Sequence, residues 1–170
     1  AGPMDYTQGA MRNATKKNYQ PVNSEAMSQG TRCHQLAEYV VFDSPLNMLC
    51  DSPSNYMAEV ECTKFISDCP TVWDESVAVN GFLGRFITLA RRSGDVWYVG
   101  SLNDWRARDL TLDLGFLGEG DWEMEIFRDG INADRAARDY KHETVTVPSD
   151  KKVKIHMAPG GGWTARITKK

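Results

Sequence analysis

The sequence has no large excess of charge of either sign and no long apolar run. Its 170 residues include 20 Lys and Arg against 23 Asp and Glu, which gives a net charge of −3. Nucleic-acid binding draws on a basic surface, and this composition does not supply one. No apolar stretch approaches the roughly 18 residues that a membrane-spanning helix needs. We therefore expect neither nucleic acid nor a membrane among its partners.

The motifs of several common catalytic and cofactor sites are also missing. There is no G-x-S-x-G sequence, and no Ser or Cys stands in a recognisable nucleophile motif. The cysteines form no C-x-x-C pair, and the three histidines are not at zinc-ligand spacing from them, so we expect no zinc site. We expect free thiols, with a disulfide as the alternative in an oxidising compartment. The four cysteines are Cys33, Cys50, Cys62 and Cys69.

Two stretches resemble ligand sites only superficially. The run APGGGW at 158–163 lies between two predicted strands and opens no helix, so we predict a hairpin or bulge instead of a phosphate loop. The stretch RDGINADRAARDY contains Asp129 and other oxygen ligands, but not in the order of a calcium-binding EF-hand loop. We interpret it as an Asp-Gly turn followed by a polar connection. Glu123 and Glu125 are predicted surface charges on one strand.

The first part of the chain reads as loop and helix. Gly2 to Thr7 is predicted to be a short strand, and the polar stretch 12–30 a long loop of the kind that is usually functional or mobile. Apolar residues at helical spacing predict a helix in TRCHQLAEYVVFDSP, with Thr31 as its N-cap and Pro45 as its stop. A second helix is predicted from a cap at Ser54 to the break at Pro70.

The second part, from about Trp73, alternates apolar and polar residues with a period of two. In LTLDLGFL, for example, Leu110, Leu112 and Leu114 point to one side. Ser93-Gly94 is predicted to be a tight hairpin turn. The predicted strands are 86–92, 95–102, 110–117, 122–127, 142–147, 153–158 and 163–168. One apolar face per strand favours antiparallel sheets packed as a small β-sandwich.

The two parts differ in how complete they are. Residues 73–170 have enough apolar strand faces to enclose a core, whereas one strand and two helices in residues 1–72 do not. Such a unit is what remains of a (β/α) barrel or of an α/β sheet that is cut before its last strand, so we expect the chain to be a fragment. Barrel chemistry gathers at the carboxyl ends of the strands. Asp5 and Tyr6 at the strand end, and His34 near the start of the next helix, are therefore the predicted substrate contacts. The alternative is that Asp5 caps the turn and Tyr6 packs against the barrel rim.

The same residues carry a resemblance. GPMDYTQGAMRN, GTRCHQLAEYVVFDSPLNMLCDSPSNY, PTVWDES, DVWYVGSLNDW, FRDGINADR and MAPGGGW resemble, in order, the C-terminal portion of glycoside hydrolase family 97. This family contains α-glucosidases and α-galactosidases of bacteria that degrade α-linked glycans. Gln8 departs from the pattern, because a proline is expected in the MDYTPG-like motif, and this loosens the turn without changing the fold.

The resemblance implies a mixed fold: the end of a catalytic (β/α)8 barrel at 1–72, followed by an all-β antiparallel C-terminal sandwich at 73–170. It also implies an oligosaccharide substrate, bound by the barrel, and export to the periplasm or secretion. The family's catalytic carboxylates and most ligands of its calcium lie on earlier strands, so no catalytic or metal role is assigned to any residue here. The family includes retaining and inverting members; the MDYT and GTRCHQ motifs favour the retaining, α-galactosidase-like branch.

Three hypotheses follow. The first is a C-terminal part of a family 97 α-glycosidase that is inactive by itself. The second is a carbohydrate-binding module that uses Trp97, Trp105 and Trp163 as a stacking platform, for which Trp105 in the loop NDWRARD is the best candidate because the other two fall on the core side of strands. The third is a structural interaction domain that docks on a companion chain, such as the N-terminal remainder of the enzyme.

Overall fold

The computed structural model describes residues 3 and 5–170. In this part of the chain the helices come first and most of the strands follow. The helices are α1 (Arg32–Val41), α2 (Pro53–Ala58) and α3 (Val60–Asp68). The strands are β1 (Asn13–Ala14), β2 (Ser28–Gln29), β3 (Glu75–Phe82), β4 (Phe86–Ser93), β5 (Val96–Asn103), β6 (Arg108–Asp113), β7 (Trp122–Asp129), β8 (Tyr140–Thr146), β9 (Lys152–Met157) and β10 (Gly162–Lys169).

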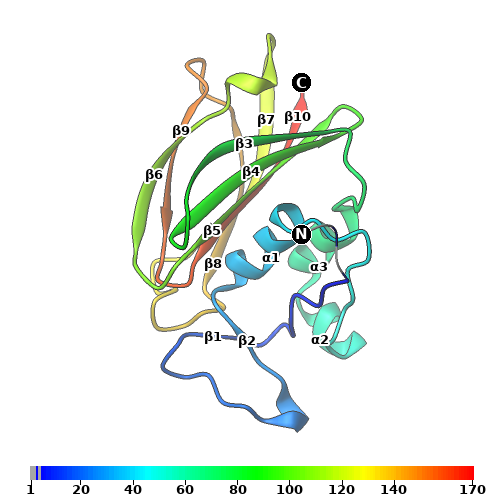
Figure 1. The fold of residues 1–170 in the computed structure, drawn as a ribbon, viewed down its shortest axis with the longest axis vertical. Coiled ribbons are helices and arrows are strands. Elements are labelled where there is room, and N and C mark those ends of the chain that lie inside the picture. Colours follow the sequence, from blue (N-terminus) through cyan, green and yellow to red (C-terminus); the bar gives the residue numbers. More distant parts are fainter. Residues whose placement is uncertain (1–2, 4) are drawn as a thin grey trace.

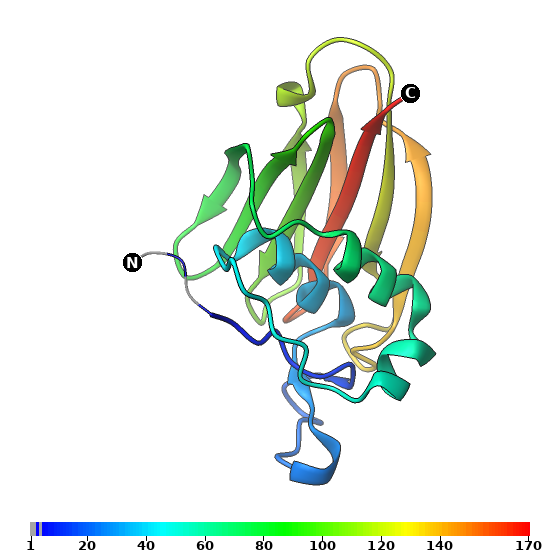
Figure 2. The ribbon, with the colours of Figure 1, turned by 90° about the vertical axis from the view of Figure 1, so that its right-hand side faces the viewer.

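Three layers make up the molecule. The central layer is a six-stranded antiparallel sheet in the order β3-β4-β5-β10-β7-β8. The antiparallel pair β6-β9 covers one of its faces, and the helices cover the other (Figures 1 and 2). The fold is therefore mostly antiparallel β-sheet with a few short helices, and the predicted packing of two sheets on a common core is confirmed.

The alternation of the sequence explains the core between the two sheets. Leu112 and Leu114 are fully buried in it, with Leu110 packed at its edge, as predicted. Trp97 and Trp163 lie in the same core, which confirms the prediction that neither faces the solvent. Apolar side chains from β6 and β9 thus meet those of β5, β7 and β10, and burial of this apolar surface is the main stabilising term of the β part.

Three strand predictions need correction. The strand predicted at 110–117 ends at Asp113 and gives way to a short 3-10 helix. β3 was not predicted, because as an edge strand with a bulge between Ala78 and Asn80 it is largely exposed and lacks a clean apolar face. The predicted hairpin at 158–163 is wrong: β9 pairs with β6 while β10 pairs with β5 and β7, so this glycine run crosses between the sheets. The hairpin turn at Ser93-Gly94 is confirmed.

The predicted cap of α1 is confirmed, whereas the second helix differs from the prediction. The hydroxyl oxygen of Thr31 accepts a hydrogen bond from the His34 N–H at 3.1 Å. The cap of α2 is Ser52 instead of Ser54, and Pro53 takes the first helical position, where its missing N–H costs no hydrogen bond. The chain leaves the helical conformation at Glu59, so two short helices replace the single one expected.

The described residues before α1 are mostly loop, and the part from β1 to β2 projects beyond the end of the sheet (Figures 1 and 2). Within this loop β1 pairs with β2 in parallel. Gly2 and Met4 of the strand predicted from Gly2 to Thr7 lie outside the described residues, and Tyr6 makes an isolated parallel bridge with Asn47.

No helix in the described part of the chain is long and apolar enough to cross a membrane. All four cysteines have free thiols.

Candidate functional site

Asp5 and Tyr6, the first two predicted substrate contacts, lie on a segment that pairs with the loop after α1. The Tyr6 N–H donates to the carbonyl of Leu46 at 3.3 Å, and its own carbonyl accepts from the Met48 N–H at 2.9 Å. The Tyr6 ring packs edge-on against Phe42, with the ring centroids 4.5 Å apart. Asp5 is exposed. Packing therefore holds Tyr6 in place, while the carboxylate of Asp5 remains accessible.

His34, the third predicted contact, lies in the first turn of α1 and is turned toward the glycine run between β9 and β10. Its Nδ1 lies 2.9 Å from the carbonyl oxygen of Gly161. Because a carbonyl only accepts, Nδ1 carries the proton and donates it. Burial lowers the pKa of His34, opposed by this hydrogen bond, so the ring is neutral at pH 7. The ring therefore joins the helix to the sheet.

Glu38, one turn further along α1, was not identified from the sequence. It is 9% exposed, and burial raises its pKa to about 8. Its Oε1 lies 3.5 Å from Nε2 of His34, and its Oε2 has no hydrogen-bond partner among the described residues. Burial also raises the pKa of Tyr6, with Glu38 as the second cause. The structure thus places Tyr6 and His34 near one buried carboxyl group that is protonated at neutral pH.

Stability is expected to depend on the charge of Glu38. The pKa of about 8 in the folded state exceeds the ordinary value near 4.5, so this contribution to stability is complete below about pH 4 and is lost as the pH rises toward 8. We expect the free energy of unfolding to fall by about 3 kcal/mol between pH 5 and pH 8, because the decline is up to about 1.4 kcal/mol per pH unit between the two pKa values. Glu38→Gln, which stays neutral, should flatten this decline in urea titrations at several pH values. An equally steep decline in the variant would assign the effect to another group.

Asp129, at the end of β7, connects the start of α1 to the sheet through hydrogen bonds. Its Oδ1 accepts from the hydroxyl of Thr31 at 2.6 Å, and its Oδ2 accepts from the N–H groups of Ala158 and Gly162 at 2.8 and 3.1 Å. Burial raises the pKa of Asp129 to about 6, although these hydrogen bonds favour the charged form. One carboxylate therefore links the helix cap, the end of β7 and the glycine run.

Glycine is required at 161 and 162 because a side chain at either position would clash with its neighbours. A Cβ at Gly161 would lie 2.0 Å from Oδ2 of Asp129, and one at Gly162 would lie 2.6 Å from the backbone of His34. The neighbouring Gly160 adopts a φ of +65°, which favours glycine. The carbonyl of Gly160 also accepts from the Thr31 N–H at 2.9 Å. The three glycines thus let the sheet crossover touch α1 directly.

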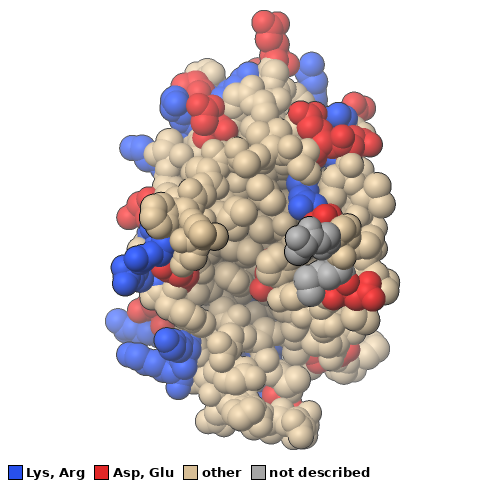
Figure 3. Space-filling model, in the orientation of Figure 1, with Lys and Arg blue, Asp and Glu red and all other residues tan. Residues whose placement is uncertain are grey.

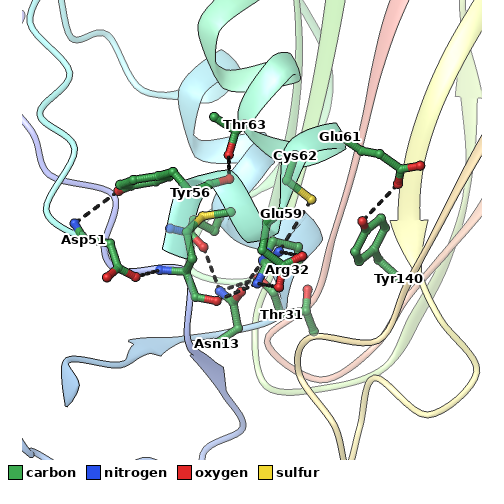
Figure 4. A network of polar contacts seen from close by, with 12 residues as sticks. Asn13, Thr31, Arg32, Asp51, Tyr56, Glu59, Glu61, Cys62, Thr63 and Tyr140 are labelled. Carbon is green, nitrogen blue, oxygen red and sulfur yellow. Dashed lines mark hydrogen bonds and ion pairs between the residues drawn. The ribbon is translucent and has the colours of Figure 1, made fainter. Parts of the chain in front are cut away.

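Arg32 holds the loop and the helices together beneath α1 (Figure 4). The side chain is fully buried and forms a double contact with the carboxylate of Glu59, at 3.0 and 3.2 Å. It also donates to the side chain of Asn13, the carbonyl of Met11 and the sulfur of Cys62. Burial lowers the pKa of Arg32, but the hydrogen bonds to Glu59 and Cys62 raise it above its usual value. The guanidinium therefore stays charged in the interior.

These buried polar groups position α1 and show no arrangement for a reaction. The oxygens of Asp129 and the nitrogens of Arg32 are already hydrogen-bonded to the protein. Among the described residues, no three His, Cys, Asp or Glu side chains are grouped closely enough to hold a metal ion. Of the three tryptophans predicted to form a sugar-stacking platform, Trp97 and Trp163 are buried. The third, Trp105, is 37% exposed and packs against Gly160. Asp5 is the accessible polar group of the predicted site.

Comparison with protein families identifies the region. The family model described as "Glycosyl-hydrolase 97 C-terminal, oligomerisation" matches residues 72–168. A retaining alpha-galactosidase of Bacteroides thetaiotaomicron is 60% identical over 167 residues, which is 98% of this chain and 25% of that protein. The chain spans about a quarter of the length of the curated relatives that it matches.

Solved structures agree with this match. A family 97 enzyme from Pseudoalteromonas sp. strain K8, in complex with panose, has a TM-score of 0.84 and 34% identity; the match covers 100% of this chain and 27% of that one. The same strain's enzyme was also solved with acarbose. A beta-arabinopyranosidase has a TM-score of 0.72 and 28% identity, covering 85% of this chain and 22% of that one. The fold described above is therefore similar to regions of longer glycosidases.

Proposed function

The chain belongs to glycoside hydrolase family 97, and we propose that it forms the C-terminal part of a retaining α-galactosidase. One observation carries the proposal: the identity of 60% to the Bacteroides thetaiotaomicron retaining alpha-galactosidase extends along 98% of the chain. That extent includes the helices and loops before β3 as well as the strands.

We propose further that residues 1–72 complete a (β/α)8 barrel and that residues 73–170 are the C-terminal sandwich. The order of the elements supports this division, because an extended segment at Tyr6 leads through a long loop into α1. The helices then pack on the sheet through Cys33, Leu36 and Val40, so the two parts share a core. A barrel built this way would be fixed to the sandwich through α1.

In a retaining α-galactosidase one carboxylic acid protonates the leaving oxygen and a second carboxylate attacks the sugar carbon, which gives a covalent intermediate. We place both groups on earlier barrel strands, outside this chain. Asp5, at the barrel mouth, would hydrogen-bond a substrate hydroxyl, with Tyr6 beside it. The complexes of relatives with panose and acarbose support an oligosaccharide substrate. His34 stays a predicted contact, although its ring is engaged by Gly161.

We also propose that the complete enzyme binds calcium and is exported from the cytoplasm. The residues described here do not fit a calcium site, so its ligands would come from the preceding barrel strands. Periplasmic location or secretion would place the enzyme where α-linked oligosaccharides enter the cell envelope.

The function is tested with a polypeptide that adds the proposed upstream barrel to this chain. We expect it to release galactose from an aryl α-galactoside with the α-anomer as the first product, as seen by NMR. A site built around the axial 4-hydroxyl of galactose should favour this substrate over the α-glucoside by about 100-fold or more. The 170-residue chain alone should be inactive. Activity of the chain alone, preference for the glucoside, or a first product of β configuration would contradict the proposal.

In the same enzyme, Asp5→Asn should raise KM about tenfold with a smaller change in kcat, because it weakens a charge-assisted hydrogen bond to the substrate. His34→Asn is the matched variant at the junction of helix and sheet. A higher KM for His34→Asn would support its predicted contact, whereas a lower thermal midpoint at constant KM would assign it to the junction. An unchanged KM for Asp5→Asn would remove Asp5 from the substrate site.

Self-association is a second proposed property. The family model that matches residues 72–168 is described by the word oligomerisation. We propose that this region of the chain also binds a second copy of itself.

A further inference from the structure

We propose that the tip of the β3–β4 hairpin is the surface through which two copies of this chain associate; this rests on the self-association proposed above. The hairpin tip is defined here as residues 81–87. It presents Leu83, which is 99% exposed, and Phe82, which is 64% exposed, next to the partly exposed Ile87. All three lie within the region that matches the family model.

The exposure of Leu83 is built into an ordered turn. The Arg85 N–H donates to the carbonyl of Phe82 at 2.9 Å, and the Asp104 N–H donates to the carbonyl of Arg85 at 2.8 Å. Gly84, with a φ of +73°, completes the turn. Tight turns ordinarily carry Gly, Asn, Asp, Ser or Pro, since these residues suit the backbone and the solvent. Leucine at this position contributes nothing to the turn, so its apolar side chain is available to a partner.

The tip is complementary to itself. Leu83 stands at a hollow of about 580 Å³, which it lines together with other apolar groups that include Phe82, Phe86, Ile87 and Leu102. A two-fold interface uses the same patch twice, so it needs a protrusion and a recess on one surface. Leu83 of one copy can enter the hollow of the other, while Leu83 of the second copy does the reverse.

The charges at the rim of the hollow fit the same arrangement. Nη1 of Arg85 lies 3.9 Å from Oδ2 of Asp104, whose Oδ1 lies 3.3 Å from Nη2 of Arg108, so these charges are paired within one copy and none of them is left unpaired when the surface is covered. Arg85 and Asp104 line the hollow. Figure 3 shows that the middle of the face carrying β3 and β4 is hollowed and nearly free of charged side chains, which gather at its margins. An apolar centre with a charged rim is typical of protein interfaces.

Other apolar surfaces fit self-association less well. The exposed residues Leu46, Leu49 and Met57 precede the matched region and belong to the part proposed to contact the barrel. The free edge of β3 carries a bulge between Ala78 and Asn80, a feature that discourages pairing with another strand. Within 72–168 the hairpin tip combines neighbouring exposed apolar side chains with a hollow.

The test compares the molar masses of the wild-type chain and two variants by light scattering and sedimentation at several concentrations. Leu83→Asp should weaken dimer formation at least about 100-fold, because both copies lose a buried leucine. Ile131→Asp, at a 96% exposed position on the loop after β7, is the matched control and should remain dimeric. At a dilution at which the wild type is monomeric, both variants should keep the wild-type thermal midpoint, which excludes unfolding as the cause.

The possible outcomes test the proposed surface and the proposed self-association separately. A dimeric wild type whose Leu83→Asp variant is also dimeric would overturn the hairpin tip as the interface, and the hollow would then be covered by another part of the polypeptide. A wild type that is monomeric up to about 100 μM would overturn both the self-association and its surface, since a useful Kd lies in or below that range. Neither result would affect the α-galactosidase proposal, which is tested by hydrolysis.

Discussion

Arg32→Ala is expected to lower the free energy of unfolding by about 3–5 kcal/mol, the cost typical of removing one partner from a buried ion pair. The substitution takes a fully buried guanidinium away from Glu59 and leaves the side-chain oxygen of Asn13 and the carbonyl of Met11 without their donor (Figure 4). Unsatisfied buried acceptors carry their full desolvation cost. The loop before α1 and the helices after it would lose their common attachment.

Urea denaturation at pH 7 measures this effect. Arg32→Lys should fall between the wild type and Arg32→Ala, because a lysine keeps the charge but cannot donate to several acceptors in the planar geometry of arginine. Lys64→Ala removes an exposed pair with Asp68 and should cost less than about 0.5 kcal/mol. A loss below 1 kcal/mol for Arg32→Ala would mean that the network adds little to stability.

The β part of the fold was largely predictable because its strands have two different faces. Trp122, Met124 and Ile126 alternate with charged residues, and all three face the core between the sheets. Alternation of this kind fixes both the strand and the direction of its side chains. The turn at Ser93-Gly94 also predicted that β4 pairs with β5. Local sequence was sufficient for these features.

Elements without such a pattern were missed or misjudged. β3 is an edge strand, so little of it is buried and its sequence shows no clean alternation. The break between α2 and α3 at Glu59 interrupts an otherwise helical pattern, and Glu59 is positioned to reach Arg32. The crossover at 158–163 resembles a hairpin along the chain, since only the partners of β9 and β10 reveal that they belong to different sheets.

The polar site depends on contacts between distant residues, which explains why so little of it was predicted. Thr31 was identified as a cap, but its second role requires Asp129, which is 98 residues away. Arg32 resembles an ordinary residue of a first helical turn until the loop and α3 surround it. The one local signal was the spacing of His34 and Glu38 at i and i+4 on α1.

These contacts also explain how the two parts of the chain cooperate. α1 follows the segment proposed to belong to the barrel, yet its buried side chains pack on β5 and β10 of the sheet. Asp129 fixes the start of the helix to the end of β7. A rigid joint at this point would hold the barrel in one orientation on the sandwich, and the joint depends on the close approach of the glycine run.

Gly161→Ala is therefore expected to destabilise the protein by about 3 kcal/mol or more. The added methyl group would lie 2.0 Å from Oδ2 of Asp129 and 2.5 Å from the carbonyl oxygen of Ala158. The loop cannot move away without breaking the hydrogen bonds that Asp129 accepts from the backbone. Gly115→Ala is the control, because the nearest atom to its new Cβ, Oδ1 of Asp113, is 3.1 Å away. The control should change the free energy of unfolding by less than about 1 kcal/mol.

A double-mutant cycle identifies the cause. If the clash with Asp129 dominates, Gly161→Ala should cost less in an Asp129→Ala background than in the wild type, with a coupling free energy of about 1 kcal/mol or more. Urea denaturation of the four proteins at pH 7 gives this value. Strictly additive effects would assign the loss to the contact with Ala158 alone, and a Gly161→Ala variant as stable as the wild type would show that the crossover can move off α1. In that case Asp129 and the glycine run would not form a rigid joint between the helix and the sheet.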